Sequence, residues 1–412
     1  MRMMKRRLFR FTLPVLLLGS ILLSGCAKEP EVSSVQTVTS TATVEEKGIY
    51  LDDYHQFWDI LEKDYPYLPY LETRYPNLQE IRDNYEKKAA EINNLNDFYD
   101  LLQRLCREFD YFAHLCILSP DLYQMYYNIF INGSTNYLGM NTFREVLTDS
   151  NLASIYQVPQ NDYVEQQNET LPAVEVKYYE DCDALWLLIH SFDHSLLERD
   201  RTVLADTLKQ YPNTKHIIFD IQNNEGGDDY YWMTNLVLPL GGDINAWIDP
   251  PLFYRNTPRI EPFFRDAHSV PVSELNEVPK WVSDLKLDRC IVEEAYDRTL
   301  FLPFEPEPAT AGQDAKRWLL INGNVYSSAE KFTIFCKSTG WATLVGQKTC
   351  GDGIGTSPII IKLDHSGLIV RFCAIVAENN TTGQPSAYGG TEPDYPGGLT
   401  QCLEMIRAES GF

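Results

Sequence analysis

The chain has 412 residues, of which 58 are acidic and 35 are basic, so its formal net charge is −23. This excess of negative charge excludes nucleic acid as a partner. It also excludes adhesion to anionic lipid through surface charge, because like charges repel. Aromatic residues make up 12% of the chain, and a chain of this length and composition can bury a large hydrophobic core.

The first 26 residues have the pattern of an export signal. Five basic residues lie within the first ten positions, and an apolar run follows from Leu13 to Leu23. The run is too short to span a membrane and ends in small residues before Cys26. This ending, Leu23-Ser24-Gly25-Cys26, resembles the bacterial lipobox, whose cysteine receives a diacylglycerol; an ordinary signal peptide that happens to end near a cysteine is the alternative.

The lipobox resemblance implies lipidation of Cys26 and attachment to the extracytoplasmic face of a bacterial cell membrane. Without the five basic residues of the signal, the remaining chain would carry 30 basic and 58 acidic residues, a net charge of −28. Attachment would therefore depend on the acyl chains, each buried CH₂ of which contributes about 0.8 kcal/mol. The same charge would favour the approach of a cationic substrate.

Two segments of different composition follow the signal. Residues 27–48 are rich in Ser, Thr and Val and contain no aromatic residue, so we interpret them as a flexible tether. We predict that residues 49–175 are mostly helical. Apolar residues recur there at helical spacing over Tyr54–Glu62, Leu78–Ile92 and Leu95–Phe109. The second half of this region shows no clear period.

Residues 176–412 have the pattern of an α/β domain. Short apolar strands alternate with helical segments, which is typical of a sheet covered by helices. An insertion at residues 241–313, rich in Pro and aromatic residues, interrupts the alternation. The expected strands are 184–192, 216–221, 317–322, 342–346, 357–363 and 367–376, and the expected helices are 195–211, 229–238 and 328–338.

Two junctions between a strand and a helix contain residues suited to chemistry. The first ends in Gly226-Gly227, where a ligand can approach the backbone N–H groups closely; a plain tight turn would look the same. The second places Ser327 where a helix begins, at its positive end, with the N–H of Ser328 next to it. Ser327 and Glu330 also fit a capping box, which requires no chemistry. Neither junction alone identifies a function.

In this order and at this separation, the two junctions resemble those of the C-terminal processing (tail-specific) serine peptidases. The resemblance covers Ala184 to Pro396. It implies the crotonase/ClpP-like α/β spiral fold of that family for the catalytic domain that follows the helical region, and we expect no cofactor or metal. Its further motifs are Gly346-x-x-Thr349-x-Gly351 and Gly390-Thr391-Glu392-Pro393-Asp394.

The resemblance also assigns roles to residues. The family nucleophile lies three residues before the Glu of an S-x-x-E motif, which implies Ser327. The family's oxyanion hole then implies the backbone of Gly226 or Gly227 together with the N–H of Ser328.

Three features depart from the tail-specific pattern. Asp352 occupies the position after the last glycine of G-x-x-T-x-G, where those members carry a lysine base. Gln222 replaces the usual arginine of the double-glycine turn, and no PDZ-like segment precedes Ala184. Because a carboxylate is a far weaker base than a neutral lysine amine, a Ser–Lys dyad is not expected.

A branch without a PDZ segment, to which the nisin-resistance protein and tricorn-type peptidases are similar, takes its base from an N-terminal histidine. His114, at the end of a predicted helix, matches that position. Histidine titrates near neutral pH, which suits a general base. His190 and His194 compete for the role but lack the motif. Glu378 and Glu392 are the candidates for the acid that orients the imidazole.

We therefore predict a serine endopeptidase that acts on extracellular peptides or on exposed protein C-termini. The alternative, favoured by Asp352 and Gln222, is a catalytically inactive surface lipoprotein that binds peptides. A third reading is a metal-dependent hydrolase that uses His190, Asp193 and His194, although their spacing lacks the H-E-x-x-H pattern. The sequence does not indicate an oligomeric state.

Overall fold

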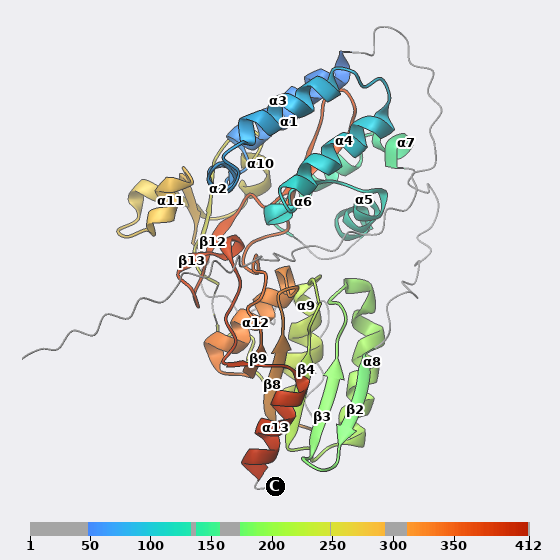
Figure 1. The fold of residues 1–412 in the computed structure, drawn as a ribbon, viewed down its shortest axis with the longest axis vertical. Helices are drawn as coiled ribbons and strands as arrows, with labels where there is room; N and C mark the ends of the chain where they lie inside the picture. Colours follow the sequence, from blue (N-terminus) through green and yellow to red (C-terminus); the bar gives the residue numbers. More distant parts are fainter. Residues whose placement is uncertain (1–47, 133–136, 157–173, 248, 293–310, 411–412) are drawn as a thin grey trace, which may run out of the picture.

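A computed structural model describes residues 48–132, 137–156, 174–247, 249–292 and 311–410. These residues form a helical part, drawn at the top of Figure 1, and a sheet part below it. The predicted lipidation site Cys26 and the predicted tether lie outside the described residues. Within them, no helix is both long enough and apolar enough to cross a lipid bilayer.

The helical part contains the three helices that apolar spacing predicts. Helix α4 begins after Asn94, whose side chain accepts the N–H of Asp97 at 2.9 Å, and it buries Leu101 and Leu105. The second half of the region is also helical as far as residue 156, which the sequence pattern did not reveal. The helices are α1 (Ile49–Lys63), α2 (Leu68–Arg74), α3 (Leu78–Ala89), α4 (Leu95–Glu108), α5 (Pro120–Tyr127), α6 (Met140–Leu147) and α7 (Leu152–Tyr156).

Buried tyrosines explain why these later helices were missed. Tyr123 and Tyr126 are 1% and 2% exposed, and their hydroxyl groups donate to the carbonyl oxygens of Leu147 and Pro358. A tyrosine buries its ring when its hydroxyl finds a partner. An apolar stripe made largely of tyrosine is therefore hard to distinguish from a polar sequence.

The sheet part is built on a six-stranded sheet of order β14-β9-β8-β4-β3-β2. All neighbouring strands are parallel except β2, which pairs antiparallel with β3 at the edge. This confirms the α/β class. Strand β2 was not predicted, because most of its side chains are exposed. The strands are β2 (Glu175–Tyr179), β3 (Ala184–Leu188), β4 (His216–Asp220), β8 (Lys316–Ile321), β9 (Thr343–Gly346) and β14 (Tyr395–Pro396).

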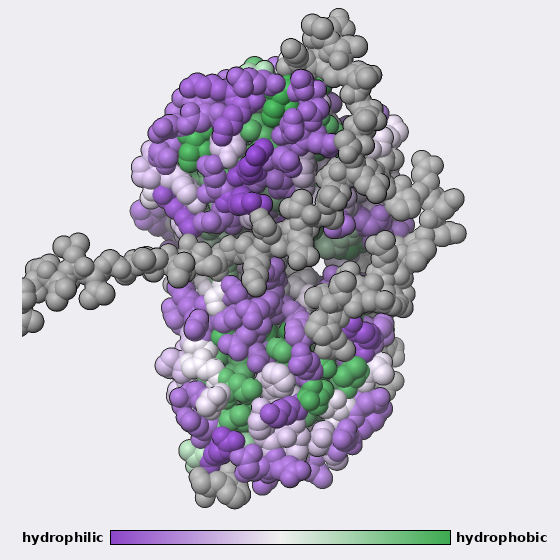
Figure 2. Space-filling view, turned by 45° about the vertical axis from the view of Figure 1, so that its right-hand side comes forward, coloured by the Kyte–Doolittle hydropathy of each residue, from purple (hydrophilic) through white to green (hydrophobic). Residues whose placement is uncertain are grey.

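Helices cover both faces of this sheet. Successive side chains of a strand point to opposite faces, so Ile218 packs with Cys402 and Ile406 of α13 (Leu399–Ser410), whereas Ile217 and Phe219 join the main core. That core includes α8 (Leu197–Gln210), α9 (Asp229–Trp232) and α12 (Ser327–Thr339). Figure 2 shows that hydrophilic residues predominate on the outer surface of both parts in that view.

The insertion forms a second sheet with a later segment of the chain, in the order β13-β12-β5-β7-β6. It also contacts the helical part, since Arg259 pairs with Asp59 at 2.6 Å and with Asp64 at 2.7 Å. Its elements are β5 (Leu252–Tyr254), α10 (Glu261–Phe264), β6 (Ser269–Pro271), α11 (Lys280–Asp284) and β7 (Arg289–Ile291), which join β12 (Val376–Asn379) and β13 (Gln384–Pro385).

A third sheet joins distant parts of the chain. Strand β1 (Cys116–Ile117) follows the helices and pairs antiparallel with β11 (Ile369–Phe372), which in turn pairs with β10 (Ile359–Lys362). In this register Cys116 lies opposite Arg371. The β10–β11 hairpin is therefore packed against the helical part, and it brings Arg371 to the segment that carries His114.

Candidate active site

The carboxyl ends of the parallel strands β3, β4, β8 and β9 lie at one edge of the central sheet, facing the helical part (Figure 1). Ligands of open α/β sheets bind at this kind of edge. The turns after β4 and β8 are joined there: the N–H of Asn223 donates to Oδ1 of Asn322 at 3.0 Å, and the N–H of Tyr326 donates to the carbonyl of Asn224 at 3.3 Å. The two predicted junctions therefore form one site.

Ser327 occupies the first position of α12, with φ of +54°. This left-handed conformation is unfavourable for a residue other than glycine, and such strain is concentrated at functional sites. Its N–H donates to the carbonyl of Gly351 at 3.1 Å. The capping-box alternative is wrong, since Tyr326 is the N-cap and no side chain caps the helix. The serine hydroxyl is therefore left at the positive end of a 13-residue helix.

Glu330 connects three of the sequence motifs instead of capping the helix. It is fully buried, and its Oε1 accepts the hydroxyl of Thr391 at 2.7 Å. The N–H of Thr391 donates to the hydroxyl oxygen of Thr349 at 2.6 Å. Burial raises the pKa of Glu330 to about 7. The S-x-x-E, G-x-x-T-x-G and G-T-E-P-D motifs are thus held together by hydrogen bonds around one buried carboxyl group.

The double-glycine turn lies directly against the nucleophile segment. A Cβ atom on Gly226 would lie 2.8 Å from the N of Ser328 and 3.0 Å from Cβ of Ser327, so only glycine fits. The N–H of Gly226 donates to Oδ1 of Asn224 at 2.9 Å. In the part of the chain that the structure describes, the N–H groups of Gly227 and Ser328 donate to no other group. These two are the donors that remain for an oxyanion.

The loop that carries His114 is strained and firmly held. Tyr65 donates its hydroxyl to the carbonyl of Phe112 at 2.8 Å, and the N–H of Cys373 donates to the carbonyl of Ala113 at 2.9 Å. Left-handed backbone persists where surrounding contacts over-determine it. The helical part therefore fixes the position of the histidine. The residues of this loop with positive φ are Asp110, Tyr111, Ala113 and His114.

The side chain of His114 is 13% exposed and lies between two charged groups. Its Nε2 is 3.5 Å from Oδ2 of Asp352, and its Nδ1 is 3.3 Å from Nη1 of Arg371. The imidazole ring centre is 4.8 Å from that of Tyr326, the residue before Ser327. Burial, and then the Arg371 charge, hold the pKa of His114 well below its usual range. The imidazole is therefore neutral at pH 7. It makes no hydrogen bond with Ser327 in the described structure.

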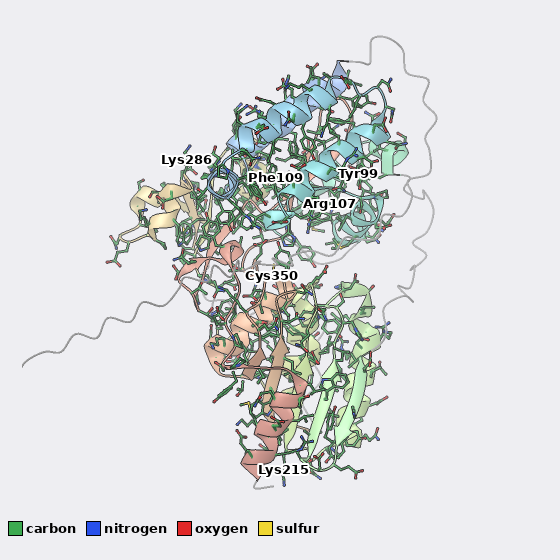
Figure 3. The ribbon with its side chains drawn as sticks, viewed as in Figure 1. Tyr99, Arg107, Phe109, Lys215, Lys286 and Cys350 are labelled. Carbon is green, nitrogen blue, oxygen red and sulfur yellow. The ribbon has the colours of Figure 1, made fainter. Side chains whose placement is uncertain are left out.

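Sequence analysis placed Asp352 at the position of the family's lysine base but did not predict its contact with His114. Asp352 is 8% exposed, has φ of +57° and accepts the hydroxyl of Tyr326 at 2.7 Å. Burial raises its pKa to about 6. The available signal was its position directly after Gly351, whose backbone bridges to that of Tyr326. Cys350, two residues earlier, marks this region at the boundary between the two parts in Figure 3.

The two predicted orienting acids do not face His114. Glu378 lies in β12, opposite Pro385 of β13. Glu392 has a 66% exposed side chain and pairs with Lys348 at 3.5 Å. Among the described residues, the acid nearest to the imidazole is Asp352. The prediction of Glu378 or Glu392 therefore needs correction, because the turn after β9 places a different carboxylate there.

The metal-dependent alternative is not supported either. Nε2 of His190 pairs with Glu175 at 3.0 Å, Nδ1 of His194 pairs with Asp228 at 2.5 Å, and Asp193 accepts the N–H of Ser195. Each side chain therefore has its own partner, and the three donors do not converge.

One group of three donors does converge within the described ranges. The ligand atoms of His114, Asp352 and Cys373 lie within 4.8 Å of one another. The neighbouring guanidinium of Arg371, with its own positive charge, makes this group unfavourable for a divalent cation.

The model of peptidase family S41 matches residues 185–396, just over half of the 412 residues. The chain belongs to peptidase family S41. Its described fold, with an N-terminal helical region and an α/β sheet, agrees with this membership. The match begins in β3 and ends in β14, so it includes both junctions and the Glu330–Thr391–Thr349 connection.

Several solved structures are similar to this chain. A lipoprotein from Streptococcus agalactiae is 14% identical, with 91% of this chain and 99% of that chain covered and a TM-score of 0.47. Mature CPAF is 11% identical, covers 89% and 96% of the two chains and has a TM-score of 0.43. The photosystem II D1 C-terminal processing protease is 12% identical, with coverages of 89% and 97% and a TM-score of 0.37. No curated protein matches the chain.

Proposed function

We propose that this S41 peptidase is a serine endopeptidase in which Ser327 is the nucleophile and His114 the general base. The observation that carries the proposal is the position of Ser327, strained at the start of α12, beside the two unused N–H donors of Gly227 and Ser328. A neutral imidazole from the helical part lies against the preceding residue, Tyr326. A nucleophile, a base and an oxyanion hole are the parts that acyl transfer requires.

The proposed reaction follows from these positions. Oγ of Ser327 attacks the peptide carbonyl carbon while its proton passes to the imidazole of His114. The N–H groups of Gly227 and Ser328 stabilise the oxyanion of the tetrahedral intermediate. The imidazolium then returns the proton to the leaving amine, and an acyl-enzyme ester forms on Ser327. Water hydrolyses the ester with the same proton transfers and restores the hydroxyl.

The charge of Asp352 supports the transfer. At 3.5 Å from Nε2, its carboxylate lies close enough to stabilise the imidazolium that forms during each step. Its elevated pKa, about 6, leaves it mostly ionised at pH 7. Asp352 therefore contributes as a counter-charge, although it replaces a lysine that is itself the base in tail-specific members.

The setting of the reaction is part of the proposal. We place the enzyme outside the cytoplasm, anchored through a lipid on Cys26, with peptides or exposed protein C-termini as substrates. The lipobox-like ending of the signal supports the anchor. The net charge of −28 that remains without the signal's basic residues favours cationic peptides through faster encounter.

Labelling with a fluorophosphonate tests the catalytic proposal directly. This reagent bonds covalently to an activated serine, so wild type should be labelled at Ser327 and identified by peptide mass. Ser327→Ala should be unlabelled, and His114→Gln should be labelled at least a hundredfold more slowly, as expected from loss of a general base (about 10²–10⁴-fold). EDTA should change nothing. Failure of wild type both to react between pH 7 and 9 and to cleave unfolded cationic peptides over the same range would overturn the proposal.

A second candidate is a catalytically inactive lipoprotein that binds peptides in the same site. It is favoured by the contacts of His114, both of whose ring nitrogens face charged groups. In that case wild type and Ser327→Ala would bind unfolded cationic peptides with equal affinity in calorimetry. Neither would cleave them, and neither would react with the fluorophosphonate.

A further inference from the structure

The imidazole of His114 lies between a cation, which can only donate hydrogen bonds, and an anion, which can only accept them. A guanidinium can only donate hydrogen bonds, so the group facing Nδ1, which is Nη1 of Arg371 at 3.3 Å, requires a lone pair on Nδ1. A carboxylate can only accept, so Oδ2 of Asp352, at 3.5 Å, favours a proton on Nε2. Both contacts select the same neutral tautomer, with its proton on Nε2.

The opposite tautomer would be opposed on both sides. A proton on Nδ1 would face the N–H of Arg371, and the lone pair of Nε2 would face the carboxylate of Asp352. The doubly protonated imidazolium is disfavoured on the Nδ1 side for the same reason. Histidine tautomers are set by the hydrogen bonds that the two nitrogens make.

The guanidinium that selects this tautomer is itself held in place. Nε of Arg371 donates to the hydroxyl of Tyr126 at 2.8 Å, and Arg371 lies opposite Cys116 in the β1–β11 ladder. No carboxylate lies within 4.0 Å of Arg371 among the residues described, so no ion pair draws it away from the imidazole. Strand β11 therefore presents a fixed positive charge to Nδ1.

The groups that face the imidazole come from every element around it. They are Arg371 and Cys373 from β11 and the residue after it, Asp352 from the turn after β9, and Tyr326 from the start of α12. From the helical part, Tyr65 reaches the carbonyl of Phe112 beside it. Among these, Arg371 and Asp352 are the groups that carry a full charge at pH 7.

We propose that Arg371 and Asp352 hold His114 in a resting tautomer, protonated on Nε2, that cannot accept the proton of Ser327. The proposal rests on the proposed function and adds a requirement to it: one of the two contacts must break before cleavage. Arg371 is then a positioning residue that keeps the base inactive until the site is rearranged, and peptide binding is the event that would rearrange it.

Nitrogen NMR of protein labelled with ¹⁵N-histidine measures the tautomer without any need for activity. His114→Gln assigns the His114 signals among those of the seven histidines. Wild type should show Nε2 protonated and Nδ1 unprotonated at pH 7, and Nδ1 should stay unprotonated well below pH 6.5. A wild-type spectrum with the proton on Nδ1 would overturn the proposal, whether or not the protein reacts with a fluorophosphonate.

Variants of Arg371 test whether its guanidinium keeps Nδ1 of His114 unprotonated. Arg371→Met removes the donor and the charge, so protonation of Nδ1 should move up toward pH 6.5, and the acid limb of kcat/KM should move with it. Arg371→Lys keeps a cationic donor and should remain close to wild type. Arg255→Met is the matched control, because Arg255 is another buried arginine, 8% exposed, that donates only to backbone carbonyls.

Should Arg371→Met fail to fold, Tyr126→Phe provides a milder test. It removes the hydroxyl that fixes Nε of Arg371, so the titration of Nδ1 should shift in the same direction by a smaller amount. Identical Nδ1 titrations in wild type and in a folded Arg371→Met protein would show that the guanidinium does not control the tautomer, and would refute the proposal.

Discussion

The carboxylate of Asp352 lies 3.5 Å from Nε2 of His114 and also accepts the hydroxyl of Tyr326 at 2.7 Å. At this position the tail-specific peptidases, which this chain resembles, carry a lysine. The replacement of that lysine by Asp352 therefore leaves an ionisable group at this position of the site. In the proposed mechanism, it exchanges a base for a counter-charge, and the proton transfer falls to a histidine from a distant part of the chain.

Asp352→Asn should lower kcat by about 10- to 100-fold, because loss of the counter-charge 3.5 Å from Nε2 would destabilise the imidazolium of the transition state by about 1.4–2.8 kcal/mol. The pKa of Asp352 is about 6, so activity that needs its carboxylate falls as the pH drops through 6, and the variant should lack this limb. Asp200→Asn is the matched control, since Asp200 is buried and accepts the hydroxyl of Tyr231 at 2.7 Å. Equal losses of kcat in both variants would contradict this role.

Gly226→Ala should abolish cleavage and lower stability. Its Cβ would lie 2.8 Å from the N of Ser328 at φ of +100°, so the nucleophile segment must shift. Displacement of an oxyanion donor costs about 10²–10³-fold in kcat. Gly340→Ala, at φ of +69° with nothing within 4 Å, should cost about 1–2 kcal/mol of stability and leave kcat unchanged. Steady-state kinetics and thermal denaturation of both variants are the measurement. A loss of kcat in Gly340→Ala as large as that in Gly226→Ala would show that backbone strain alone lowers kcat.

Tyr65→Phe should lower kcat through the loop of His114. The variant loses the hydrogen bond to the carbonyl of Phe112, so the strained loop gains other conformations. Tyr54→Phe loses an equivalent bond, 2.6 Å long, to the carbonyl of Arg82, far from the site. Both should lose about 1 kcal/mol of unfolding free energy. A loss of kcat in Tyr54→Phe as large as that in Tyr65→Phe would argue against a specific role for the loop.

Glu330→Gln should change how stability depends on pH. The pKa of Glu330 is raised from 4.5 to about 7 by burial. The folded state therefore binds this proton more tightly, and its contribution to stability, complete below pH 4.5, is lost as the pH rises through 7. The variant, which still accepts the hydroxyl of Thr391, should gain about 3 kcal/mol relative to wild type between pH 4.5 and 8. Urea denaturation at pH 4.5 and at pH 8 measures this. The prediction is refuted if the difference in unfolding free energy between the variant and wild type is the same at both pH values.

Cys26→Ser should release the protein from the membrane. The proposed anchor is the lipid on Cys26, since the remaining chain, with a net charge of −28, is repelled by anionic lipid. Wild type should partition into the detergent phase and the variant into the aqueous phase. Retention of the variant in the membrane fraction would show a different means of attachment.

Local patterns predicted the elements of the fold well. Apolar spacing located α1, α3 and α4, and short apolar runs located β3, β4, β8 and β9, because these signals depend only on neighbours in sequence. The proposed nucleophile, the double-glycine turn and the proposed base were predicted from a family resemblance. The capping box at Ser327–Glu330 was a local pattern that the tertiary structure overrode.

The contacts around the proposed base, His114, could not be predicted in this way. Arg371 and His114 are 257 positions apart and meet only because β1 pairs with β11. A two-residue strand has no periodicity to detect. Asp352 was visible in the sequence, but its charge acquires a role only once the imidazole lies beside it. The features that sequence analysis did not predict are therefore contacts between segments that lie far apart in the sequence.

Ser327, His114 and Asp352 share a left-handed backbone conformation, with φ of +54°, +61° and +57°. Each such residue costs about 1–3 kcal/mol, and glycine would adopt the conformation without that cost. Random variants screened only for heat resistance should therefore accumulate glycine at Ser327, whose hydroxyl makes no hydrogen bond among the described residues, rather than at His114 or Asp352, whose removal would leave a buried cavity. In this molecule a gain in thermal stability could therefore come from discarding the proposed nucleophile, so any engineering effort would have to select for cleavage and thermal stability together.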